Sequence, residues 1–159
     1  MTLIPPPFEP GAFVGAAHHY RARIYYEDTD LSGIVYHANY LRYMERARSD
    51  MLRLADIDQR AAIESGEGAW AVTDLQIKYR RPAKLDDDIL VVSTVEAVRG
   101  ASVAIAQRIL RGDDPLSFET FTEGQVIVAF LAPDGRPRRQ PTGWAKRFTA
   151  IMNGEMIPC

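Results

Sequence analysis

One long amphipathic segment, followed by four strand-like segments, is the feature that most limits what this chain can fold into. Apolar residues recur at spacings of four and three residues, at Tyr40, Met44, Ala47, Met51 and Leu54. This is the period of a helix that buries one stripe of side chains. The sequence therefore predicts one long helix over residues 37–55, with acidic and basic residues on its other face.

Segments with the two-residue period of strands lie on both sides of this helix. The predicted strands are at residues 19–27, 69–81, 88–98, 102–110 and 116–132, and short helices are predicted at 58–64 and 143–152. The "RGA" stretch between the third and fourth strands is typical of a tight hairpin. Because the later strands are joined by short turns, we expect them to be antiparallel.

The order of one strand, one long helix and four strands predicts an α+β fold. One helix cannot cover both faces of a sheet of about five strands, so we expect a curved antiparallel sheet wrapped around the helix. The rest of the sheet then requires burial by another subunit, because open edges and apolar faces favour association. We expect an obligate homodimer that pairs further into a homotetramer, with an interface above roughly 1,000 Å².

Composition excludes several classes of protein. The 159 residues carry a net charge of −2, which gives no general attraction to nucleic acid. No apolar run approaches the roughly 20 residues that span a bilayer. The only cysteine is Cys159, which favours a reducing, cytoplasmic location. We expect a Pro- and Gly-rich arm at residues 1–18 and one domain at residues 19–153.

The entrance to the long helix holds the candidate chemistry. Asp28 and Asp30 precede it, His37 lies in its first turn, and Gly33 allows close approach of a ligand. The free amides of a first helical turn attract an anion, including a transient oxyanion. A carboxylate beside them can act as a general base or as a nucleophile. Turn formation and helix capping are the more common roles of two aspartates before a helix, so spacing alone leaves the function open.

Other patterns are not informative about chemistry. His18 and His19 are adjacent, so on a strand they point to opposite faces and make a poor pair of metal ligands. We predict no metal site. The sequence also lacks the G-x-S-x-G turn of serine hydrolases and the glycine-rich loop that binds phosphates.

Three segments resemble hotdog-fold acyl-CoA thioesterases of the 4-hydroxybenzoyl-CoA thioesterase-like, Tol-Pal-associated branch. They read "YYEDTDLSGIVYHANYLRYMERARSDML", "LQIKYRRPAKLDDDI" and "VRGASVAIAQRI", within a resemblance that runs from Tyr20 to Phe148. The resemblance implies a curved antiparallel sheet around a central helix, in dimers and commonly tetramers. It also implies an acyl-CoA substrate, no separate cofactor, and a partner in the cell-envelope system.

The same resemblance implies roles for particular residues. Asp30 is the catalytic carboxylate, and the amides of Tyr36 and His37 polarise the thioester carbonyl, with the His37 side chain also implicated. Leu31 and Ser32 replace smaller residues that are common after this aspartate, a departure that bears on the acyl pocket.

Coenzyme A also carries phosphates that need a basic surface. By resemblance, Arg99 and Ser102 are the leading candidates to bind them. Arg80, Arg81 and residues 136–139 are weaker candidates, for which a solvated strand edge is the more common role.

A thioester needs little help to break, because a thiol with a pKa near roughly 8.5 leaves without a strong general acid. One carboxylate and one oxyanion site therefore suffice for hydrolysis. Two alternatives remain. A non-catalytic hotdog module would use the groove only to bind acyl-CoA or protein, and a hotdog dehydratase would use His37 with an acid across the groove.

Overall fold

The computed structural model describes residues 11–112 and 119–158 of the chain. Its elements are β1 (Gly11–Val14), β2 (Ala17–Arg23), a 3₁₀ turn (Tyr26–Asp28), α1 (Asn39–Leu54), α2 (Gln59–Glu64), β3 (Ala69–Tyr79), β4 (Asp88–Val98), β5 (Ser102–Arg111), β6 (Thr120–Leu131) and α3 (Thr142–Asn153). The predicted long helix, both short helices and the hairpin between β4 and β5 are all present.

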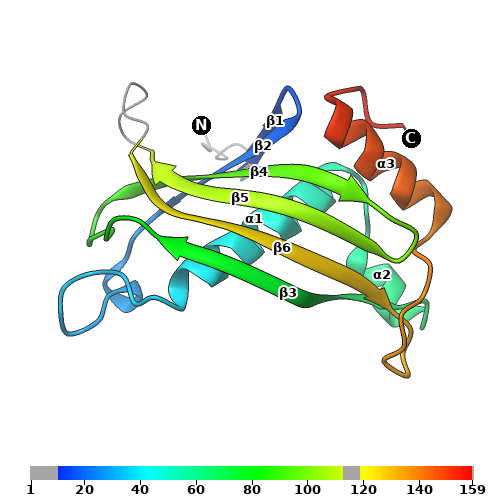
Figure 1. Ribbon diagram of the computed structural model, residues 1–159, viewed down its shortest axis with the longest axis horizontal. Helices are drawn as coiled ribbons and strands as arrows, with labels where there is room; N and C mark the ends of the chain where they lie inside the picture. The colour runs from blue at the N-terminus through cyan, green and yellow to red at the C-terminus, as the bar shows by residue number, and fades with distance from the viewer. Residues whose placement is uncertain (1–10, 113–118, 159) are drawn as a thin grey trace, which may run out of the picture.

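Within the described residues, the strands form one six-stranded sheet in the order β1-β2-β4-β5-β6-β3. Every pair of neighbours is antiparallel. The sheet curves around α1, which lies against one of its faces, while α3 packs at the end where the β4–β5 hairpin lies (Figure 1). The predicted α+β architecture of a curved antiparallel sheet around one helix is confirmed.

The number and order of the strands differ from expectation. β1 lies within residues 1–18, which we expected to be an arm outside the domain, and it makes a sixth strand. β3 does not pair with β4, which follows it in the chain, but with β6 at the other side of β5. The β3–β4 connection is therefore a crossover rather than a hairpin.

The predicted apolar stripe of α1 is buried except at its end. Tyr40, Met44, Ala47 and Met51 are at most 3% exposed, whereas Leu54 is 42% exposed. Ala55 is fully buried instead. This correction reflects the helical period, because a true 3.6-residue repeat drifts away from a strict alternation of three and four.

Helix α1 covers only part of the sheet. It packs against β1, β2, β4 and β5. On β3 the side chains of Val72, Leu75 and Tyr79 pair in register with Val128, Val126 and Thr122 of β6, yet these three β3 side chains are 49%, 38% and 47% exposed. The concave side of the sheet therefore has an apolar strip at its β3 edge that α1 leaves uncovered.

Candidate active site

Asp30 lies at the tip of the loop between β2 and α1. The loop turns tightly there, because the amide of Gly33 donates to the carbonyl of Asp30 at 3.0 Å and Gly33 adopts a φ of 80°. The Asp30 carboxylate is exposed, and its Oδ1 accepts hydrogen bonds from both the hydroxyl and the amide of Ser32. These bonds hold the pKa of Asp30 below its usual value, with a smaller contribution from His37. The carboxylate is therefore ionised and open to solvent.

Asp28 has a different environment. It is 9% exposed, and its Oδ2 accepts hydrogen bonds from the hydroxyl of Tyr43 at 2.6 Å and the amide of Tyr25 at 2.8 Å. Its carbonyl accepts from the side chain of Asn39, in the first turn of α1, at 2.9 Å. Asp28 thus ties the loop to α1. The residue before α1 is Ala38, so neither aspartate side chain caps this helix.

Ala83 holds the same loop from the other side. Its amide donates to the hydroxyl of Tyr40 at 3.0 Å, and its carbonyl accepts from the amide of Val35 at 2.9 Å. An isolated bridge between Ile34 and Lys84 adds a second backbone contact. The Asp30 turn is therefore fixed between α1 and the β3–β4 connection.

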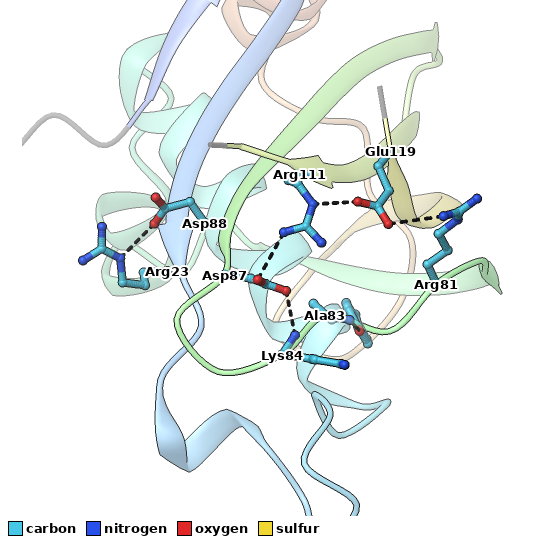
Figure 2. A network of polar contacts seen from close by, with 9 residues as sticks. Arg23, Arg81, Ala83, Lys84, Asp87, Asp88, Arg111 and Glu119 are labelled. Atoms are coloured by element: carbon cyan, nitrogen blue, oxygen red, sulfur yellow. Dashed lines mark hydrogen bonds and ion pairs between the residues drawn. The ribbon is translucent and has the colours of Figure 1, made fainter. Parts of the chain in front are cut away.

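A network of ion pairs orders that connection (Figure 2). Asp87 accepts from the amide of Lys84 at 2.8 Å and from Arg111 at 3.1 Å. Arg111 in turn bonds Glu119 at 2.6 Å, and Glu119 faces Arg81 at 3.5 Å. These contacts hold in place the segment that contains Ala83.

The weaker candidates for phosphate binding include two arginines that already have acidic partners. Arg81 is paired with Glu119, and Arg80 is paired with Glu123. Both arginines directly follow the end of β3 and have acidic partners.

The amides at the start of α1 require a correction. The amide of Tyr36 donates to the carbonyl of Asp28 at 2.9 Å, so it is not available to a substrate. In contrast, no hydrogen bond found among the described residues has the amide of His37 or Ala38 as its donor. Of the two expected oxyanion donors, the geometry retains His37, and Ala38 is the next free amide.

The side chain of His37 is exposed beside Asp30 and packs on aromatic neighbours. Its ring lies 4.4 Å from the ring of Tyr36 and 6.4 Å from that of Tyr79, measured between centroids. The hydroxyl of Tyr79 donates to the His37 carbonyl at 2.9 Å. The end of β3 therefore fixes the backbone of His37.

Arg99 and Ser102 close the β4–β5 hairpin, where the amide of Arg99 donates to the carbonyl of Ser102 at 2.8 Å. They lie at the opposite end of the sheet from Asp30. The Asp30 loop contacts the connection just before β4, whereas Arg99 follows the last residue of this 11-residue strand, which is about 36 Å long at roughly 3.3 Å per residue. One chain does not bring Asp30 and Arg99 together.

Comparison with a family profile identifies the family to which the chain belongs. Residues 32–118 match the profile described as "Thioesterase superfamily". This span begins beside Asp30 and covers α1, α2 and the three strands β3, β4 and β5, including the hairpin residues Arg99 and Ser102. The chain belongs to the thioesterase superfamily.

Relatives of known name agree with this membership. The chain is 40% identical over 116 residues to the acyl-CoA thioesterase YbgC of Haemophilus influenzae, across 73% of this chain and 85% of the relative. It is 35% identical over 127 residues to the acyl-CoA thioester hydrolase YbgC of Escherichia coli O157:H7, across 79% and 91%. The expectation that this member of the superfamily is a thioester hydrolase is confirmed.

Solved structures share the fold. A probable thioesterase from Bartonella henselae is 32% identical, with a TM-score of 0.71 over 79% of this chain and 99% of that one. A 4-hydroxybenzoyl-CoA thioesterase is 17% identical, with a TM-score of 0.75 over 83% and 98%. The hotdog fold is confirmed. No helix in the described part of the chain is long and apolar enough to cross a membrane.

Proposed function

We propose that this thioesterase hydrolyses an acyl-CoA thioester to a free acid and coenzyme A, with Asp30 as its catalytic carboxylate. The proposal is supported by two groups on one loop: the exposed, ionised Asp30, and the amide of His37 just before α1, which donates to no acceptor among the described residues. The loop that holds both is fixed through Asp28 and Ala83. A rigid carboxylate beside an unpaired amide is what carbonyl attack requires.

The steps follow from these groups. As general base, Asp30 removes a proton from a water molecule while that water attacks the thioester carbonyl carbon. The developing oxyanion accepts hydrogen bonds from the amides of His37 and Ala38. Collapse of the intermediate breaks the carbon–sulfur bond and releases the thiolate, which takes up the proton. In the nucleophilic variant, Asp30 forms an anhydride that water then hydrolyses.

Substrate binding adjusts the basicity of Asp30. In the free chain its pKa is lowered, which makes it a weak base. A substrate or a partner subunit placed over this exposed carboxylate would remove water and raise its pKa toward the working range of a general base.

A basic cleft supports the assignment of Arg99 to coenzyme A. Arg99, Arg139 and Lys146 line a cavity of about 650 Å³ between the β4–β5 hairpin and α3, together with one acidic residue, Glu155, and apolar walls from Val98 and Met156. None of these three cations has an ion-pair partner among the described residues. Unpaired cations beside an apolar wall suit a nucleotide with phosphates. Ser102 does not line this cleft, and its carbonyl instead holds the amide of Arg99 in the hairpin turn.

Homodimer formation completes the site. The basic cleft and Asp30 lie at opposite ends of one sheet, so a two-fold related copy is needed to bring them together. The apolar strip of Val72, Leu75 and Tyr79 and the open edge of β3 are the surface for that copy. A homotetramer, a cytoplasmic location and an envelope-system partner enter the proposal through the resemblance to the Tol-Pal-associated branch.

The test is thiol release from a panel of acyl-CoAs by wild-type protein and by Asp30→Asn. We expect the variant to fold normally and to lose roughly 10²-fold or more in turnover. Normal turnover by a folded Asp30→Asn protein would overturn the assignment. An enoyl product detected by ultraviolet absorbance would indicate a dehydratase, and binding without thiol release would indicate a recognition module.

The phosphate assignment has its own test. Arg99→Ala should raise KM for an acyl-CoA and change KM much less for the matching acyl-pantetheine, which has no nucleotide phosphates. Equal losses on both substrates would refute it. Light scattering and activity along a dilution series test the dimer, since a monomer with full specific activity would exclude a shared site.

A further inference from the structure

The amides of His37 and Ala38, which have no acceptor among the described residues, belong to two consecutive peptide groups just before α1. A peptide group is planar and trans, so its carbonyl and its N–H point in opposite directions. Whatever holds the carbonyl of Tyr36 therefore aims the amide of His37. In the same way, whatever holds the carbonyl of His37 aims the amide of Ala38. The partners of these two carbonyls decide the direction of both proposed oxyanion donors.

The first of the two carbonyls is held by the helix itself. The amide of Asn39, the first residue of α1, donates to the carbonyl of Tyr36 at 2.8 Å. This bond is a backbone turn at the start of the helix, and it needs no side chain. The amide of His37 is therefore aimed by local structure alone.

The second carbonyl is held from the sheet. The hydroxyl of Tyr79, the last residue of β3, donates to the carbonyl of His37 at 2.9 Å. No other donor to this carbonyl is found in the part of the chain that the structure describes, because the amide of Leu41 donates to the carbonyl of Ala38 instead, at 3.2 Å. One side-chain hydroxyl from β3 therefore fixes the peptide group that carries the Ala38 amide.

Tyr79 is itself held in place. Its backbone pairs in register with Thr122 of β6, and its ring meets that of the buried Tyr40 edge-on at 5.7 Å between centroids. Burial raises the pKa of the Tyr79 phenol above its usual value, so the hydroxyl remains a donor at any working pH. A hydrogen bond donated to a carbonyl also polarises the peptide group, which makes the N–H at its other end a stronger donor.

We propose that Tyr79 is a positioning residue for the oxyanion site, whose hydroxyl aims and polarises the peptide group that presents the Ala38 amide to the thioester carbonyl. This inference rests on the proposed function. Tyr79 acts through the peptide group and not on the substrate itself. The oxyanion site is therefore completed by the end of β3, in addition to the first turn of α1.

The first experiment compares Tyr79→Phe with wild type in steady-state kinetics on one acyl-CoA that the wild type hydrolyses. The variant keeps the aromatic ring and loses only the hydroxyl. We expect kcat to fall about 10-fold, which is less than the roughly 10²-fold or more lost when an oxyanion donor is removed outright. KM should stay within about 2-fold, because the hydroxyl acts on charge that develops in the transition state. The acidic limb of kcat/KM should not move, since Asp30 keeps its own hydrogen-bond partners.

Tyr20→Phe is the matched control. Tyr20 is a partly buried tyrosine on β2, and its hydroxyl makes no hydrogen bond that is found among the described residues. We expect its kcat to equal that of wild type. Both variants are assayed at a temperature at which circular dichroism and light scattering show the wild-type fold and assembly. Wild-type kcat in Tyr79→Phe, a change confined to KM, or a shifted acidic limb would overturn the proposal.

The second experiment observes the thioester carbonyl directly. Asp30→Asn should bind an acyl-CoA and hydrolyse it slowly, so infrared difference spectroscopy with an isotope-labelled carbonyl can report its stretching frequency in the site. Hydrogen bonds to a carbonyl lower this frequency. Adding Tyr79→Phe to Asp30→Asn should move the frequency back toward its value in solution, and adding Tyr20→Phe should not.

Equal carbonyl frequencies with and without the Tyr79 hydroxyl would overturn the proposal. An Asp30→Asn protein that hydrolyses the acyl-CoA at the wild-type rate would instead refute the proposed function. The two failures are therefore seen in different measurements.

Discussion

The hydroxyl of Tyr43 donates a 2.6 Å hydrogen bond to the buried carboxylate of Asp28. This bond connects the second turn of α1 to the loop that carries Asp30. Burial, followed by the bond to Asp28, raises the pKa of Tyr43, so the phenol remains a donor at any working pH. The two aspartates of the "DTD" sequence therefore have separate tasks, because Asp28 fixes the loop and Asp30 is left exposed.

Asp28→Ala should destabilise the fold, because the Tyr43 hydroxyl and the Tyr25 amide would lose their acceptor. We expect a loss of about 1–3 kcal/mol in the free energy of unfolding, measured in urea. Asp28→Asn retains an acceptor oxygen and should cost less, and it should reduce turnover less than Asp30→Asn does. The reverse ranking of the two asparagine variants would assign catalysis to Asp28.

Ser32→Ala should raise the pKa of Asp30. The Ser32 hydroxyl is the largest cause of the lowered pKa, and the Ser32 amide remains in the variant. Since the reactive form is the carboxylate, the acidic limb of kcat/KM should move to higher pH. A carboxyl-carbon NMR titration of Asp30 checks this directly. An unchanged pKa would mean that the hydroxyl does not stabilise the anion.

His37→Ala should lower turnover by less than the roughly 10²-fold expected for Asp30→Asn. The amide of residue 37 supplies the oxyanion contact, and the hydroxyl of Tyr79 still holds the adjoining carbonyl. The turnover of His37→Ala and of Asp30→Asn is compared by steady-state kinetics on one acyl-CoA. Equal losses would show that the imidazole takes part in the reaction.

Acidification should destabilise the protein through His18. This residue is fully buried, and Nε2 lies 2.7 Å from Asp50. Burial lowers its pKa below 6.5 despite the opposing effect of Asp50. The unfolded chain therefore takes up a proton first as the pH falls, and stability declines from about pH 6.5 down through the folded pKa. Urea unfolding of wild type and His18→Gln at about pH 7.5 and pH 5.5 should show a smaller decline in the variant.

Gly11→Ala should destabilise the fold by about 1–3 kcal/mol, as overpacking of a core usually does. A methyl group there would lie 2.7 Å from His18 Nε2 and closer still to the Asp50 carboxylate. Gly143→Ala is the control, because a Cβ at that position meets nothing within 4 Å. The midpoint of thermal unfolding is measured for both variants. Equal midpoints for Gly11→Ala and Gly143→Ala would contradict the close packing of β1.

Local periodicity was sufficient to predict the long helix and the β4–β5 hairpin, because neighbours in sequence determine both. It failed for β1, where Gly11 is required by contact with His18 and Asp50 from other elements. It also failed for the order of the strands, since nothing in the β3 segment specifies β6 as its partner.

The candidate site likewise has some features that the sequence predicted and others that it did not. The interpretation of Asp28 as the structural aspartate agrees with its hydrogen bonds, and the roles of Asp30 and His37 remain predictions. The Tyr36 amide was misassigned because its acceptor is a backbone carbonyl eight residues earlier, which no side-chain pattern reveals. Tyr79 and Lys146 gave no signal in the sequence, because the hydroxyl contact of the one and the cleft of the other form only when distant elements meet.

In the proposed homodimer, the part of the sheet that α1 leaves uncovered would link folding to protein concentration. Val72, Leu75 and Tyr79 are exposed in one chain and would be buried by the second copy, so part of the free energy that stabilises each chain would be free energy of association. By mass action, the midpoint of thermal unfolding should then rise with protein concentration. A cell that makes little of this enzyme would lose folded protein as well as active sites.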